Sequence, residues 1–176
     1  CIPLSFYYSF ANVFLNDLGM EGAAGKMIYG QISEAIFILA IPFLYYRLGV
    51  KNILIIGIAA WALRFFFFAN GDLEAYYWMI ISGILLHGIC YDFFFVTGYM
   101  YTENKAGEKI KNAAQGLFTV ATYGIGMTIG SWFSGIITDS NTIEGIKNWG
   151  DIWMVPAYIS GAVLIFLVVF FKEKNK

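Results

Sequence analysis

Charged residues are scarce in this chain of 176 residues. Asp, Glu, Lys and Arg together make up 13% of it, whereas soluble domains carry about a quarter. Hydrophobic residues reach 59% and the mean hydropathy is +0.66, which is more apolar surface than a soluble core needs. The composition therefore predicts a polytopic α-helical membrane protein embedded in a lipid bilayer. The net charge of -1 gives no reason to expect a nucleic-acid partner.

Residues that build metal centres and cross-links are also few. The chain has two cysteines, Cys1 and Cys90, and one histidine, His87. Cys90 lies inside an apolar segment, so neither a disulfide framework nor a zinc site is indicated. The sequence contains no HExxH, no G-x-S-x-G, no phosphate-binding loop and no spacing typical of a paired nucleophile and base. We therefore expect no enzyme activity, no catalytic residue, no metal and no cofactor.

The sequence also lacks an initiating methionine and a signal peptide with a basic start. It begins with Cys1, and the first apolar run follows at once. A lipidated Cys1 would be followed by a soluble domain, which the pattern does not show. We therefore expect the chain to be a piece of a longer protein whose N-terminal part is missing.

Long apolar runs fill the sequence instead. Each is close to the roughly 20 residues that cross a bilayer. They predict six transmembrane helices at about 2–18, 27–46, 53–69, 75–101, 113–137 and 152–171. In the fifth run, Gly126 and Gly130 form a GxxxG that Ser134 extends, which allows another helix to approach closely. The predicted fold is an all-α membrane protein, with one six-helix unit over 1–176.

The loops between these runs differ in charge. With an even number of crossings, both chain ends lie on one side of the membrane. That side would hold Arg47, Lys51, Lys105, Lys109, Lys111, Lys172, Lys174 and Lys176. The other side would hold only Lys26 and Lys147. Because basic loops stay in the cytoplasm, the bias predicts a cytoplasmic RLGVKN loop at 47–52, a cytoplasmic connector at 102–112 and a cytoplasmic C-terminus.

Ionisable side chains interrupt the apolar runs, where a charge is costly unless it faces protein, water or ligand. Glu34 shares a helix face with Gln31, and the pair can bind a polar solute or take up a proton. The alternative is an interhelical hydrogen bond that only holds helices together. Arg64 can pair with Glu34 or Asp92, or reach the outer interface. We favour a structural role for Arg64, because the FFFF that follows it is typical of a lipid-facing or packing surface.

The densest group of polar residues lies in HGICYDFFFVTG at 87–98. His87 and Tyr91 are four residues apart and share a face, while Asp92 points about 100° away from Tyr91. A lone histidine is more often a packing residue than a ligand. Here the combination of His, Tyr and Asp within two turns favours a path for a polar solute or a proton. Weaker candidates for the same cavity are Tyr8, Asn12 and Tyr123.

Five motifs along the chain point to one family. They are GQISE (30–34), RLGVKN (47–52), AWALRF (60–65), HGICYDFFFVTG (87–98) and AAQG (113–116). They resemble the C-terminal six-helix half of the nucleoside:proton symporter family, within the major facilitator superfamily, and the resemblance covers nearly the whole chain. It implies half of a twelve-helix permease of the bacterial inner membrane that takes up nucleosides with protons. Its partner would be the missing N-terminal half.

The resemblance also implies a site. In this family the first, second, fourth and fifth helices of this half line the cavity, and the third and sixth are peripheral. The residues that would bind the nucleoside are Asn12, Gln31, Glu34, His87 and Tyr91. Asp92 and Glu34 would couple protons to transport. Better-known members have Tyr at the position of His87 and Phe at that of Tyr91, so the chain departs from the family's pattern there.

Three alternatives stand beside this interpretation. One is a sugar or oligosaccharide:proton symporter of the same superfamily. Another is a membrane scaffold or receptor that transports nothing. The weakest is an intramembrane enzyme, because the nucleophile and base are missing.

Overall fold

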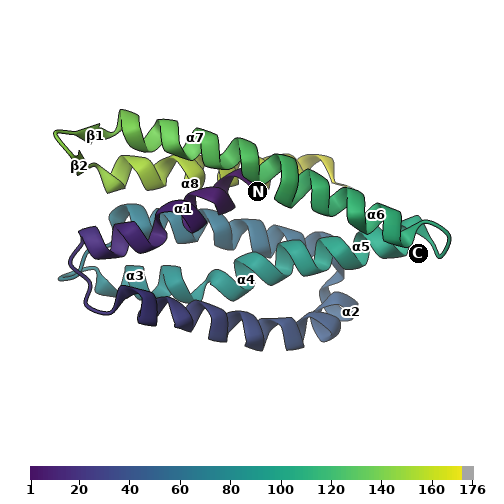
Figure 1. Ribbon diagram of the computed structural model, residues 1–176. Coiled ribbons are helices and arrows are strands. Elements are labelled where there is room, and N and C mark those ends of the chain that lie inside the picture. Colours follow the sequence, from purple (N-terminus) through teal and green to yellow (C-terminus); the bar gives the residue numbers. More distant parts are fainter. Residues whose placement is uncertain (172–176) are drawn as a thin grey trace.

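The computed structural model describes residues 1–171 and is a bundle of long helices lying side by side (Figure 1). The helices are α1 (Ile2–Asp17), α2 (Ala23–Asn70), α3 (Tyr77–Leu85), α4 (His87–Tyr91), α5 (Thr97–Ala106), α6 (Lys111–Thr119), α7 (Met127–Ser140) and α8 (Trp149–Phe170). Two π-helical segments, η1 (Asp92–Val96) and η2 (Val120–Gly126), join α4 to α5 and α6 to α7. The predicted helical class is confirmed, and the basic tail at 172–176 lies outside the described residues.

Helix α2 reverses direction near its middle. At 1.5 Å per residue, its 48 residues would extend about 72 Å if the helix were straight. Gly49 breaks it with φ 76° and ψ 162°, a left-handed conformation that glycine adopts without a steric penalty. The two arms, 23–48 and 50–70, run back along each other (Figure 1). The predicted six-residue loop at 47–52 is therefore wrong in length, because one glycine makes the turn.

Three helical stretches are long and apolar enough to cross a membrane. They are Ala23–Asn70, Lys111–Ser140 and Trp149–Phe170. A fourth results if the bent pair Tyr77–Leu85 and His87–Ala106 counts as one span. The apolar helical character predicted from composition is thus present, and α1, with 16 residues, is shorter than these three stretches.

The region predicted as one helix at 75–101 is interrupted twice. It bends by 41° at Leu86, between α3 and α4, and becomes π-helical at η1. The next stretch becomes π-helical at η2. The predicted connector at 102–112 is also shorter than expected, because helix continues to Ala106 and resumes at Lys111. Interruptions of this kind are frequent at functional sites.

The start of α1 packs against the row of small residues in the fifth predicted segment. A Cβ on Gly130 would lie 2.9 Å from the Cα of Ile2, and one on Gly126 would lie 2.9 Å from the Cβ of Cys1. Ser134 is fully buried on the same helix. The predicted close helix approach at the GxxxG is therefore confirmed, with the start of α1 packed on α7 and Cys1 next to Gly126.

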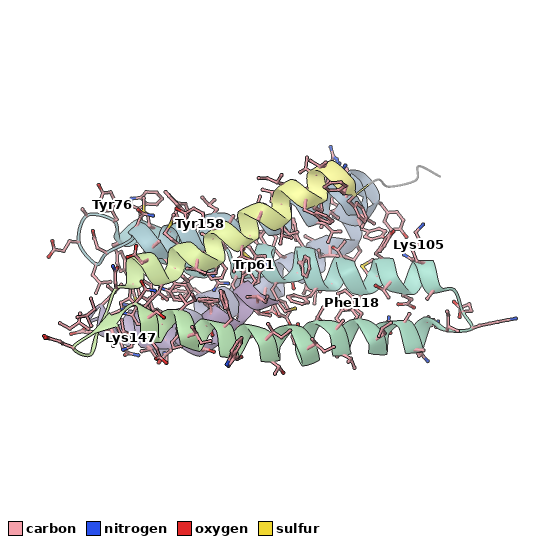
Figure 2. All side chains as sticks on the ribbon, turned by 90° about the horizontal axis from the view of Figure 1, so that it is seen from above. Trp61, Tyr76, Lys105, Phe118, Lys147 and Tyr158 are labelled. Atoms are coloured by element: carbon pink, nitrogen blue, oxygen red, sulfur yellow. The ribbon has the colours of Figure 1, made fainter. Side chains whose placement is uncertain are left out.

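The two ends of the bundle carry different connections. Figure 2 places Lys105 and Lys147 at opposite ends, as the predicted loop topology requires. Near Lys147, the strands β1 (Thr142–Ile143) and β2 (Ile146–Lys147) form a short antiparallel hairpin. The Nζ atom of Lys147 lies 3.0 Å from Oδ2 of Asp17, which ties the hairpin to the end of α1. The hairpin replaces part of the polar loop expected before α8.

Candidate functional site

Three ionisable side chains from different helical stretches meet inside the bundle. Nη1 of Arg64, on the second arm of α2, lies 2.8 Å from Nδ1 of His87, at the start of α4. The other ring nitrogen of His87, Nε2, lies 3.5 Å from Oε2 of Glu34 on the first arm of α2. Arg64 is fully buried, His87 is 5% exposed, and the side chain of Glu34 is 32% exposed. The imidazole therefore bridges a buried cation and a carboxylate at the surface of the bundle.

Aromatic rings surround the Arg64 guanidinium. Its central carbon lies 3.6 Å from the centroid of the Tyr7 ring and 5.7 Å from that of Trp61. Nε and Nη2 of Arg64 have no hydrogen-bond partner within the described residues. Cation–π contact with Tyr7 thus supplies part of what hydration would give in water.

Sequence reasoning favoured a structural role for Arg64 outside the site, and the structure shows its side chain buried in contact with His87. Arg64 pairs with neither Glu34 nor Asp92 within residues 1–171, and it points into the bundle against His87. Phe65 and Phe68, expected at a lipid-facing or packing surface, are both buried in the core. A charge inside an apolar run was the signal that could have assigned Arg64 to the site.

Glycines allow the first arm of α2 and α4 to approach closely. A Cβ on Gly30 would lie 3.1 Å from the Cβ of His87. A Cβ on Gly88 would lie 2.5 Å from the carbonyl carbon of Ser33. The hydroxyl of Ser33 donates a hydrogen bond to the carbonyl of Leu85 at 2.6 Å, next to the bend in the helix. This packing brings Glu34 and His87 within reach of each other.

Asp92 follows this group in the sequence but is held differently. It is fully buried at the first position of η1, and neither carboxylate oxygen has a hydrogen-bond partner within the described residues. An unpaired buried carboxylate is costly, which makes it a candidate for proton uptake.

A row of aromatic side chains extends from His87 toward η2. The hydroxyls of Tyr91 and Tyr123 are hydrogen-bonded to each other. The Tyr91 ring lies 5.7 Å from the His87 ring, and the His87 ring lies 5.1 Å from that of Tyr7. Tyr8, the neighbour of Tyr7, is 54% exposed. The structure thus brings Tyr91 and Tyr123 together and identifies Tyr7, which sequence reasoning did not single out.

Two predicted binding residues lie apart from this group. Asn12 is exposed on α1, where its amide nitrogen lies 3.7 Å from the sulfur of Met27 and its oxygens accept from Asn16. Gln31 is exposed on the first arm of α2, one turn before Glu34. Neither forms a hydrogen bond with Glu34 or His87 in the described part of the chain. Their predicted contact with a nucleoside stays a prediction.

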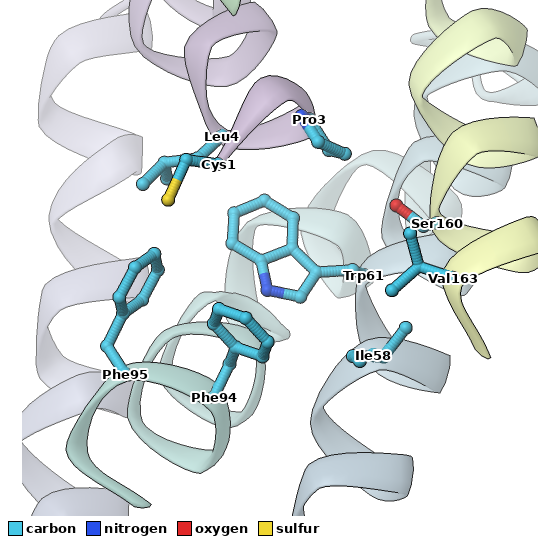
Figure 3. A pocket seen from close by; sticks show the side chains of 9 residues that line it. All are labelled: Cys1, Pro3, Leu4, Ile58, Trp61, Phe94, Phe95, Ser160 and Val163. Atoms are coloured by element: carbon cyan, nitrogen blue, oxygen red, sulfur yellow. The ribbon is translucent and has the colours of Figure 1, made fainter. Parts of the chain in front are cut away.

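Two hollows in the described part of the bundle lie elsewhere. One of about 70 Å³ lies between α1, α2, η1 and α8 (Figure 3), and its lining residues are Cys1, Pro3, Leu4, Ile58, Trp61, Phe94, Phe95, Ser160 and Val163. The other, of about 560 Å³, lies between the arms of α2 and the α3–α4 bend. Neither is lined by Glu34, His87 or Asp92. Within the described residues, Glu34 is the member of this group that reaches a face of the bundle, with 32% of its side chain exposed.

Comparison with known proteins gives consistent matches. The family model described as "Nucleoside H+ symporter" matches residues 1–176. YegT of Escherichia coli is 37% identical over 182 residues, covering 99% of this chain and 43% of YegT. The nucleoside permease NupG of Escherichia coli is 33% identical over 174 residues, covering 97% of this chain and 42% of NupG. A crystal structure of NupG superposes with a TM-score of 0.88 at 32% identity, covering 97% of this chain and 45% of that one. The chain thus spans less than half the length of these relatives.

Proposed function

Because the chain belongs to the nucleoside H+ symporter family, we propose that it forms part of a membrane permease that takes up nucleosides together with protons. The family and the named permease among its relatives are transporters, in keeping with a chain that is not an enzyme. The observation that carries the proposal is the Arg64–His87–Glu34 contact, in which Arg64 and His87 are buried, within an apolar bundle of this family. Ionisable groups at such depth are typical of solute and proton pathways.

The proposed architecture is half of a twelve-helix, major-facilitator-type transporter. The six spans would be α1, the two arms of α2, the bent stretch from α3 to α5, the stretch from α6 to α7, and α8. A 48-residue helix is more than twice the length that spans a bilayer, so its reversal at Gly49 supports two spans. The absent partner would be an N-terminal six-helix half. Coverage of less than half of each relative supports this division.

The proposed setting is the inner membrane of a bacterium, with the C-terminus cytoplasmic. The Gly49 turn and the α5–α6 connection lie at one end of the bundle (Figure 1), and both carry basic residues. The opposite end holds the β-hairpin and the end of α1. Since basic loops are retained in the cytoplasm, the first of these ends is the inner one.

The proposed substrate site lies on the face through which Glu34 is exposed. Its nucleoside-binding residues are Asn12, Gln31, Glu34, His87 and Tyr91. Carboxylate, amide and imidazole groups suit the hydroxyls and base edges of a nucleoside, and the second half of the transporter would close over them. Glu34 and Asp92 are the proton-coupling acids, because neutralising a site carboxylate changes the balance between inward-open and outward-open states.

Uptake by cells expressing the full-length transporter tests the proposal. We expect concentrative uptake of labelled uridine or adenosine, competition by other nucleosides but not by sugars, and loss of uptake when an ionophore removes the proton gradient. Glu34→Gln and Asp92→Asn should each abolish concentrative uptake. Glu21→Gln, in the exposed turn before α2, is the matched control and should leave uptake unchanged. Intact proton-driven uptake in both acid variants would refute the coupling assignment, and competition by sugars alone would refute the substrate class.

A further inference from the structure

Arg64 determines which nitrogen of His87 carries the proton. A guanidinium has five N–H donors and no acceptor, so the imidazole nitrogen that faces it accepts the hydrogen bond. Nδ1 of His87 lies 2.8 Å from Nη1 of Arg64 and is therefore the unprotonated nitrogen. In a neutral imidazole the remaining N–H is then on Nε2, which faces Glu34 at 3.5 Å.

The ionisable side chains in contact with His87 fit this assignment. Arg64 approaches from the second arm of α2 and Glu34 from the first arm. Tyr7 of α1 stacks on the imidazole, and Tyr91 lies one turn along on α4. A proton on Nδ1 would put two cationic groups in contact in a buried setting, and Glu34 reaches only the far nitrogen. The imidazole is oriented as a neutral donor aimed at the carboxylate.

Resting on the proposed function, we propose that Arg64 is a positioning residue that locks His87 as a neutral Nε2–H donor. His87 then presents Nε2–H toward Glu34, 3.5 Å away, in the empty site, and donates it as a hydrogen bond to an acceptor on the nucleoside in the loaded site. The transported proton is carried by a carboxylate and not by the imidazole.

A pH profile separates this role from simple packing. The probe is labelled uridine uptake by the full-length transporter from about pH 5 to about pH 8, the range in which histidine titrates. Arg64→Met removes the donor and the charge at similar length, which frees Nδ1 to bind a proton with Glu34 as its counter-ion. We expect an added acid-side loss of uptake of about tenfold in Arg64→Met. This acid-side loss should be absent from the double variant Arg64→Met/His87→Gln. It should also be absent from Arg64→Lys, which keeps a cation that only donates hydrogen bonds.

Two outcomes of this experiment would overturn the proposal. Arg64→Met could lower uptake equally at every pH, which would make Arg64 a packing residue. Alternatively, His87→Gln alone could remove an acid-side inflection already present in the wild type, which would make His87 a proton carrier. Membrane levels of each variant, measured by immunoblotting, control for expression and insertion.

A second measurement needs neither transport nor a mutant at Arg64. Nitrogen NMR of full-length protein labelled with ¹⁵N-histidine, with His87→Gln used to assign the signal, reports which ring nitrogen of His87 is protonated. We expect an unprotonated Nδ1 and a protonated Nε2 at neutral pH. A protonated Nδ1 would refute the inference whatever the uptake data show. If the spectrum is as expected but the protein takes up no nucleoside, the proposed function and the role of His87 in transport are refuted. The assignment of the proton on His87 by Arg64 would still hold.

Discussion

The hydroxyl groups of Tyr91 and Tyr123 are hydrogen-bonded to each other between two π-helical segments. Tyr91 is the last residue of α4, directly before η1, and Tyr123 lies within η2. The ring of Phe95, in η1, lies 5.1 Å from that of Tyr123 and 4.9 Å from that of Tyr91. The two π-helical segments of the bundle are thus linked by side-chain contacts. Because π-helical turns are frequent at functional sites, this link connects two segments of functional interest.

Removing either hydroxyl should loosen this link. We expect Tyr91→Phe and Tyr123→Phe each to lower the stability of the full-length protein, with a coupling energy of about 1 kcal/mol in the double variant. Thermal unfolding in detergent measures all three. Tyr158→Phe, at a ring 69% exposed on α8, is the matched control and should change little. Strictly additive effects would show that the two hydroxyls do not interact in solution.

The buried carboxylate of Asp92 should lower the stability of the protein, although transport requires it. It is fully buried and unpaired within residues 1–171, so Asp92→Asn removes a buried charge at constant size. We expect the full-length variant to be more stable by about 1 kcal/mol or more, although concentrative uptake is lost. The thermal midpoint and uptake are measured on the same preparation. A lower midpoint would mean that another part of the transporter pairs with this carboxylate.

The sequence was sufficient for the helical class of fold and for singling out three of the ionisable residues inside the apolar runs. Apolar length predicted the helical stretches, and charges inside them singled out Glu34, His87 and Asp92. The GxxxG at Gly126 and Gly130 predicted a close helix contact that α1 makes. These features depend on local composition and on spacing along one helix, which a sequence displays directly.

Other features depend on contacts between distant segments and were not predicted. Arg64 and His87 are 23 residues apart, and nothing in their spacing shows that they meet. The π-helical turns and the bend at Leu86 interrupt runs whose hydropathy is uniform. The reversal at Gly49 was expected as a longer loop because the neighbouring residues are polar, yet they continue the helix. Hydropathy predicts which segments are stable in the membrane, whereas the path of the backbone depends on which side chains pack against it.

Close packing at Gly88 should be essential to the site. A Cβ there would lie 2.5 Å from the carbonyl carbon of Ser33 and 2.6 Å from the amide nitrogen of Glu34, and these backbone atoms cannot move independently. We expect Gly88→Ala to separate the first arm of α2 from α4, at a cost of about 1–3 kcal/mol, and to abolish uptake. Gly135→Ala is the matched control, because nothing lies within 4 Å of its added Cβ. It should be neutral or stabilise α7 by about 0.5–1 kcal/mol. Normal uptake by Gly88→Ala would show that the arms tolerate separation.

Two side-chain donors hold the short helix α4 at its ends. The hydroxyl of Ser33 donates to the carbonyl of Leu85 at 2.6 Å, beside the bend, and Nε1 of Trp61 donates to the carbonyl of Cys90 at 2.9 Å, beside η1. In a bilayer, water is not available to replace these bonds. Ser33→Ala and Trp61→Phe should therefore each destabilise the full-length protein by about 1–3 kcal/mol.

Hydrogen exchange should locate that loss of stability. Because both donors contact one segment, the variants Ser33→Ala and Trp61→Phe should accelerate amide exchange mainly over 86–96 and should combine non-additively. That segment carries His87 and Asp92, so slower uptake should accompany the faster exchange. Ser131→Ala, at an exposed serine of α7, is the matched control and should change neither. If Ser33→Ala behaved like Ser131→Ala, the bend would be maintained by helix packing alone and its carbonyl would need no partner.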